Sequence, residues 1–142
     1  MITKEDIRKI FLEDDSGELL VETARKLANE LKDEEATKTQ IRNIFTEFRI
    51  IENRWNTQSE NDHSAIRRLN MIKPKIAYQV KREEKTFRGR IEKSPLKPLE
   101  NAIVPAIEFI NSTNNKYQAF KTLMEFMEAT LAYHKVIGGS DK

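Results

Sequence analysis

Basic side chains recur through the middle of this sequence at intervals that fit one edge of an α-helix. At 100° per residue, five of them fall within about 100° of arc on a helix over residues 64–88. They are Arg67, Arg68, Lys75, Arg82 and Lys85. Cations set along one edge can follow a phosphate backbone. A solvated face whose charges pair with Glu47, Glu83 and Glu84 would present the same pattern, so both interpretations stay open on charge geometry alone.

A second basic group is expected on a helix over residues 38–56. Arg42, Arg49 and Asn53 recur there at seven- and eleven-residue spacing, beside a broad apolar face. The aromatic residues of this helix belong to the apolar face, which makes them core residues rather than stacking platforms for bases. Because no known RNA-reading motif is present, we expect backbone contact without sequence readout.

Little in the sequence could carry catalysis or bind a metal. Cys is absent, and the two His residues, His63 and His134, are far apart. The carboxylate pairs Asp14-Asp15 and Glu34-Glu35 fall at expected helix ends, where capping and solvation explain them. We therefore expect no enzyme, no cofactor and no metal, and we expect His134 to be a core or groove residue.

The charge is unevenly distributed along the 142 residues, although the net charge is only +2. Residues 1–36 carry −5, residues 37–93 carry +7 and residues 94–142 are neutral. A basic middle segment is typical of a nucleic-acid surface.

Apolar residues follow the helical period almost throughout, which predicts an all-α fold. We expect a single domain over residues 1–142, a compact bundle of five to six helices. The expected helices cover residues 3–13, about 18–33, 38–56, 64–88, 95–111 and 115–137. Residues 1–36 would form acidic N-terminal helices, 37–93 the basic helices, 94–137 core helices and 138–142 a tail. No apolar run approaches the roughly 20 residues of a membrane span, so we expect a cytoplasmic protein without a membrane partner.

Local signals place several boundaries. Thr3 with Asp6 and Thr37 with Gln40 have the spacing of helix N-caps. Pro74 lies inside the expected helix 64–88 and predicts a kink or a restart.

The C-terminal third carries further signals. Ser94-Pro95 would begin a helix, with the proline in its first turn. The helix over 115–137 bears two apolar stripes, which is typical of a central bundle helix. Gly138-Gly139 would end it.

Three motifs resemble the small subunit of the type III-A CRISPR effector, the Csm complex. In chain order they are Ile41-Arg42-Asn43-Ile44-Phe45, Lys73-Pro74-Lys75-Ile76-Ala77-Tyr78 and Glu128-Ala129-Thr130-Leu131-Ala132-Tyr133-His134-Lys135. The resemblance covers about residues 38–137. It implies a non-catalytic helical bundle, several copies of which line a ribonucleoprotein filament and contact the crRNA–target RNA duplex and neighbouring subunits. Target cleavage would belong to the adjacent backbone subunits.

The resemblance also implies roles for particular residues. RNA-backbone contacts would come from Arg42, Arg49, Lys73, Lys75 and Arg82. Tyr78 would pack locally and position them, whereas Tyr133 and His134 would be structural. The rival hypothesis is a helical protein–protein adaptor whose basic face docks an acidic partner, and a metal-free enzyme is a distant third.

Overall fold

The computed structural model describes residues 1–87, 90–92 and 94–138, with the backbone alone for residues 85–87 and 90–92. The elements are α1 (Lys4–Leu12), α2 (Glu18–Asp33), α3 (Lys38–Arg54), α4 (His63–Arg82), β1 (Lys85–Phe87), β2 (Arg90–Glu92), α5 (Lys97–Ser112) and α6 (Lys116–Val136). The all-α prediction is confirmed. Among the described residues, the structure also contains a short antiparallel hairpin formed by β1 and β2. None of the described helices is long and apolar enough to cross a membrane.

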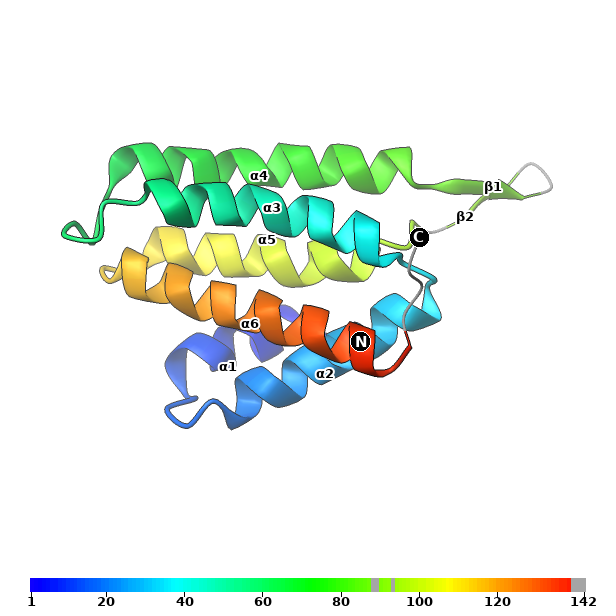
Figure 1. The fold of residues 1–142 in the computed structure, drawn as a ribbon, viewed down its shortest axis with the longest axis horizontal. Helices are drawn as coiled ribbons and strands as arrows, with labels where there is room; N and C mark the ends of the chain where they lie inside the picture. The colour runs from blue at the N-terminus through cyan, green and yellow to red at the C-terminus, as the bar shows by residue number, and fades with distance from the viewer. Residues whose placement is uncertain (88–89, 93, 139–142) are drawn as a thin grey trace.

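The helices form three layers (Figure 1). The pair α3 and α4 lies on one side, α5 and α6 lie in the middle, and α1 and α2 cover the opposite side. The basic and the acidic segments of the sequence therefore occupy opposite sides of the bundle.

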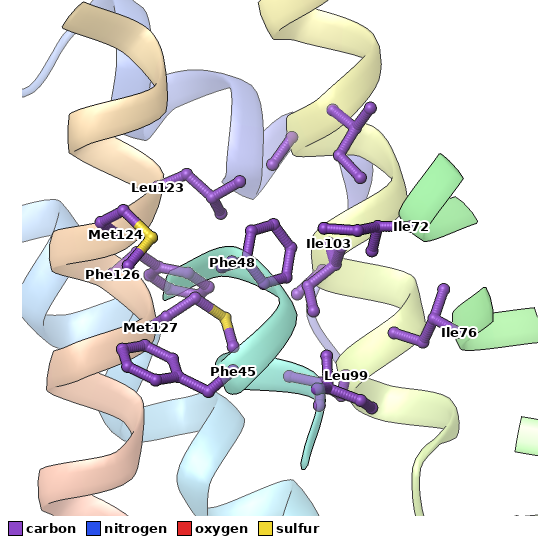
Figure 2. Packing of buried hydrophobic residues seen from close by; sticks show 14 of the residues in the cluster. Phe45, Phe48, Ile72, Ile76, Leu99, Ile103, Leu123, Met124, Phe126 and Met127 are labelled. Carbon is purple, nitrogen blue, oxygen red and sulfur yellow. The ribbon is translucent and has the colours of Figure 1, made fainter. Parts of the chain in front are cut away.

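The core between the layers contains buried apolar residues from all six helices. Figure 2 shows Phe48 of α3 between the side chains of α6 and those of α5, with Ile72 and Ile76 of α4 close by. Helix α6 is buried on both of its predicted stripes, from Phe120 to Met127, because α2, α3 and α5 all pack against it. The prediction that this helix is central is confirmed.

Both predicted N-caps form complete capping boxes. The Asp6 N–H donates to Thr3 Oγ1 (3.1 Å) and the Thr3 N–H to the Asp6 carboxylate (2.9 Å). The Gln40 N–H donates to Thr37 Oγ1 (3.1 Å) and the Thr37 N–H to Gln40 Oε1 (2.9 Å). Gly138 adopts a positive φ of 79° next to Ile137, the C-cap of α6, as expected for a residue that ends a helix, and Gly139 lies outside the described residues.

Two features of α4 differ from the prediction. The helix does not restart at Pro74 but continues through it, and Figure 1 shows it as one element. It also ends at Arg82 rather than at residue 88, because Lys85–Phe87 and Arg90–Glu92 pair as strands in the register Phe87↔Arg90. The alternating β-branched and aromatic residues around Gly89 are a hairpin signal that the helical period obscured.

The start of α5 also differs from the prediction. The helix begins at Lys97, two residues after the expected proline, and Pro98 rather than Pro95 lies in its first turn. Ser94 lies before the helix, where its Oγ accepts from the Leu96 N–H (3.3 Å).

Candidate nucleic-acid interface

A surface groove runs between α3 and α4. It consists of two hollows, a polar one of about 320 Å³ and a more apolar one of about 390 Å³. Glu47, Met71 and Lys75 line both, so the two are neighbours along α4. We call the whole feature the α3–α4 groove.

The polar hollow contains two of the predicted RNA-binding arginines. Arg67 and Arg68 line it together with Lys75, and all three are exposed. A sharp kink at Pro74 would have rotated the arginines away from Lys75. The three cations line the same hollow, so they share one groove edge despite Pro74.

Lys75 lies where the two hollows meet. Its Nζ is 3.3 Å from Glu47 Oε2 across the groove, and the two side chains are 54% and 41% exposed. An ion pair this exposed contributes little to stability, since water and salt screen it. A phosphate could therefore replace Glu47 as the partner of Lys75 at little cost in folding free energy.

The apolar hollow has a buried floor and an exposed rim. Ile72 and Ile76 are buried in its floor, whereas Met71 and Tyr78 at the rim are 53% and 64% exposed. Asn43 and Gln79 add two side-chain amides to its lining.

Arg82 extends the cationic edge to the end of α4. One of its guanidinium nitrogens donates to Gln79 Oε1 (2.8 Å), and the guanidinium carbon lies 5.9 Å from the Tyr78 ring centroid. Its Nε is also 3.7 Å from Glu83. Tyr78 therefore contacts one of the predicted cations.

Two of the predicted RNA-binding residues lie on the other edge of α3. Arg49 donates to Glu52 (2.8 Å) and, across to α6, to Glu128 (2.9 Å), and its guanidinium lies 4.9 Å from the Phe45 ring centroid. The hydrogen bond to Glu52 is the main reason that the pKa of Arg49 is raised. Arg42, two turns earlier, shares this edge by helical spacing and is exposed.

The remaining two predicted residues are also separated from the groove. Lys73 lies three residues after Asn70 on α4, on the edge that faces α5. There the side-chain amides of Asn70 and of Asn111 on α5 donate to each other's oxygen (3.0 and 2.7 Å). The side chain of Lys85 lies outside the described part of the structure. Of the eight predicted residues, the structure thus places Arg67, Arg68 and Lys75 in the groove, and Arg82 next to it, in contact with Gln79 and Tyr78 of its lining.

Three lining residues of the groove were missed by the sequence reasoning: Asn43, Met71 and Gln79. Their positions on α3 and α4 follow from the helical period, but the pairing of those two edges does not. A search for polar residues flanking two consecutive apolar stripes could have found Asn43 and Gln79.

Elsewhere, two residues that could resemble catalytic groups, Asp14 and His134, have structural partners. The carboxylate of Asp14 accepts from the backbone N–H groups of Leu19 and Leu20 (3.1 and 2.8 Å) and so caps α2. His134 is buried, and its Nε2 lies 3.1 Å from the Ala36 carbonyl oxygen. Burial lowers the pKa of His134, which favours the neutral ring with Nε2–H donating. In the part of the chain that the structure describes, no group of His, Asp and Glu could hold a metal ion.

The fold and the groove define a helical-bundle protein with a cationic surface on one side and an acidic one on the other. Among family models, the one described as Csm2 Type III-A matches residues 14–140. The chain belongs to this family, the small subunit of the type III-A Csm complex, which confirms the resemblance predicted from the sequence motifs. A search of the curated proteins and a search of the solved structures each returned no match.

Proposed function

We propose that this protein is a non-catalytic RNA-binding subunit of a cytoplasmic type III-A CRISPR ribonucleoprotein, in which it contacts the backbone of the crRNA–target RNA duplex. The observation that carries the proposal is the placement of Arg67, Arg68 and Lys75 in the α3–α4 groove, with Arg82 bonded to Gln79 of its lining. Family membership supports the assignment to the complex.

The proposed mechanism is electrostatic. The planar guanidinium groups of Arg67 and Arg68 can bind phosphate oxygens in a bidentate manner, and the ammonium group of Lys75 acts as a point charge beside them. Such contacts carry no sequence information, so recognition of the target would come from base pairing with the guide, as in other RNA-guided systems.

The other predicted RNA contacts are proposed to play smaller parts. Arg42 and Lys73 flank the groove on separate edges and would meet RNA that extends beyond it. Arg49 would first have to exchange its bonds to Glu52 and Glu128 for a phosphate. Lys85 would continue the basic edge beyond α4.

The domain would work as one unit over residues 1–142, with its acidic side turned toward protein neighbours. Leu12, Leu19 and Val21 are exposed apolar residues on α1 and α2. We propose that this side contacts other subunits of the Csm complex or further copies of the chain, since its charge would repel RNA.

The test is a double charge reversal at the groove. The variant Lys75→Glu with Arg82→Glu should bind duplex and single-stranded RNA about 10-fold or more weakly, and its log–log salt slope should fall by about 2. Fluorescence anisotropy across salt concentrations measures both quantities, and circular dichroism checks that helicity is intact.

The matched control reverses two exposed lysines on the acidic side, Lys9→Glu with Lys26→Glu, for the same change in net charge. If both variants lose the same affinity, only net charge matters and the groove has no special role. The adaptor hypothesis predicts no measurable RNA affinity in the unmodified protein even at low salt, and that result would overturn the proposal.

A further inference from the structure

The apolar hollow of the α3–α4 groove is not explained by phosphate binding. Phosphate contacts need Arg67, Arg68 and Lys75, all of which line the polar hollow. The neighbouring hollow instead has a floor of buried isoleucines and an aromatic ring, Tyr78, that is 64% exposed. An aromatic side chain beside a cationic edge is the arrangement in which proteins stack nucleobases.

We propose that the apolar hollow receives one unpaired nucleobase of the bound RNA, stacked on Tyr78, while Arg67, Arg68 and Lys75 hold the adjoining phosphates. This inference rests on the proposed RNA-binding function and extends it from the backbone to a base. It assigns Tyr78 a direct contact with RNA in addition to its contact with Arg82.

The lining suits the chemistry of a base. The apolar parts of Met71 and Pro74 can cover the faces of a flat ring, and buried Ile72 and Ile76 close the hollow below it. Gln79 accepts a hydrogen bond from Arg82, so its amide N–H groups are the ones offered to a base carbonyl. Asn43, on the opposite wall, offers a second amide for the base edge.

The charge around the hollow favours a nucleotide over an apolar peptide. Arg82 lies beside Tyr78 at one end of the hollow, and Lys75 lies at the junction with the polar hollow. Glu47 is the acidic residue in the described lining, and it is paired with Lys75. The apolar hollow extends from Met71 to Gln79 on α4, about 12 Å, which suits a single nucleotide better than a docked helix of several turns.

An unpaired base is required because bases within a duplex are stacked and paired. Only a base at a bulge, a loop or a strand end is free to leave the stack and meet an aromatic side chain. The hollow should therefore discriminate between RNAs by the presence of an unpaired nucleotide, rather than by their charge.

The experiment compares two RNAs of almost equal charge, a fully paired duplex and the same duplex with one unpaired adenosine. Anisotropy titrations of the full chain at about 50 mM salt, where phosphate contacts are strong, give both affinities. We expect the unmodified protein to prefer the bulged duplex. Tyr78→Ala should weaken binding of the bulged duplex about 5- to 100-fold more than binding of the paired duplex, which loses only the contact of Tyr78 with Arg82.

Two variants serve as controls. Tyr78→Phe keeps the ring and should retain the preference for the bulged duplex. Leu12→Ala truncates an exposed apolar side chain on the acidic side (53% exposed, against 64% for Tyr78) and should change neither affinity. All of these substitutions are at exposed positions, and circular dichroism will show whether each variant keeps its helices.

The outcomes separate this inference from the function on which it rests. Equal affinity of the unmodified protein for the two RNAs, or an equal loss of both in Tyr78→Ala, overturns the base site but leaves backbone binding intact. Absence of binding to either RNA overturns both proposals. If Tyr78→Ala binds RNA normally but fails to assemble with partner subunits, the hollow is a protein-docking site and the base assignment is wrong.

Discussion

The two outer layers of the bundle differ in their balance of charge, since residues 1–36 carry −5 and residues 37–93 carry +7. On the α1–α2 side, Arg8 and Arg25 form ion pairs with Glu5 and Glu22, one turn away. On the α3–α4 side, Lys75 and Arg82 also face carboxylates, but Arg67 and Arg68 form no ion pair among the described residues. Both layers are amphipathic helix pairs on a shared core, so the difference lies in the charges left on their outer surfaces.

This difference distinguishes charges that contribute to the stability of the fold from charges that are available to a binding partner. Exposed ion pairs within one helix add a few tenths of a kcal/mol to its stability. Cations without a nearby carboxylate add repulsion instead, which an external polyanion would relieve. The α3–α4 side therefore suits RNA, and the α1–α2 side suits protein neighbours.

The largest expected effect concerns the core that joins the two layers. Phe48 of α3 is fully buried, and Phe48→Ala should lower the free energy of unfolding by about 3–5 kcal/mol. Ile50 of the same helix is 38% exposed, and Ile50→Ala should cost less than about 1 kcal/mol. Urea denaturation followed by circular dichroism gives both values. Similar losses of unfolding free energy in the two variants would show that α3 does not pack against the core through Phe48 as described.

The next effect compares the two edges of α3 and α4. Arg67→Glu with Arg68→Glu should weaken RNA binding by about 10-fold or more, because both residues lie in the groove. Arg42→Glu with Arg49→Glu makes the same change in charge on the edge that faces α6, where Arg49 already has two carboxylate partners. We expect a smaller loss of affinity there and a loss of stability from the broken contacts. A larger loss of RNA affinity in the Arg42→Glu/Arg49→Glu variant would show that RNA binds at the α6-facing edge instead.

A third effect concerns the junction between the layers, where His134 of α6 bonds to Ala36 in the turn between α2 and α3. Burial lowers the pKa of His134 below that of the unfolded chain, about 6.5. Its contribution to stability is therefore complete above about pH 6.5 and is lost as the pH falls through the folded pKa. The non-titrating variant His134→Gln should lose less stability than the unmodified protein between about pH 7.5 and pH 5. Parallel losses in urea midpoint would show that other groups cause the pH dependence in this range. Asp6 and Asp62, whose pKa values are lowered by backbone hydrogen bonds, would contribute only below about pH 5.

Most of the fold could be predicted from the sequence because its helices are strongly periodic. The six helices, both capping boxes and the central place of α6 followed from the apolar spacing and the Thr-x-x-Asp/Gln patterns. The end of α4 could not be predicted in this way. The apolar period continues through Phe87, but in the structure Phe87 pairs with Arg90 in a hairpin. The absence of a restart at Pro74 was not predictable from the proline alone, because Leu69, Ile72 and Ile76 are buried in the core on both sides of it.

The candidate site was less predictable, because a single helical wheel cannot show which edges of two helices meet. The arc from Arg67 to Arg82 was found from one helix alone. That Arg49 faces α6 depends on Glu128, which is 79 residues away in the sequence. The apolar hollow depends on α3 and α4 together, so Tyr78 was predicted to pack locally although its ring is largely exposed.

The smallest effect compares two capping boxes of the same geometry, one in each outer layer. Thr37→Ala should cost about 1 kcal/mol, because Gln40 of this box also donates to Glu83 (2.9 Å) and links the start of α3 to the end of α4. Thr3→Ala should cost about half as much, because α1 has nine residues and buries only Ile7 and Ile10, so it can open without the rest of the bundle. Native-state hydrogen exchange distinguishes local opening of α1 from global unfolding.

The matched control for both caps is Thr46→Ala in the middle of α3. Its hydroxyl donates back to the Arg42 carbonyl (2.9 Å), a bond that adds little to a helix, and alanine is the better helix former. We therefore expect no loss of stability from this variant. If Thr3→Ala proves as costly as Thr37→Ala, α1 unfolds together with the core. The acidic layer is then as tightly coupled to the core as the layer that carries the groove, and the two sides differ in charge alone.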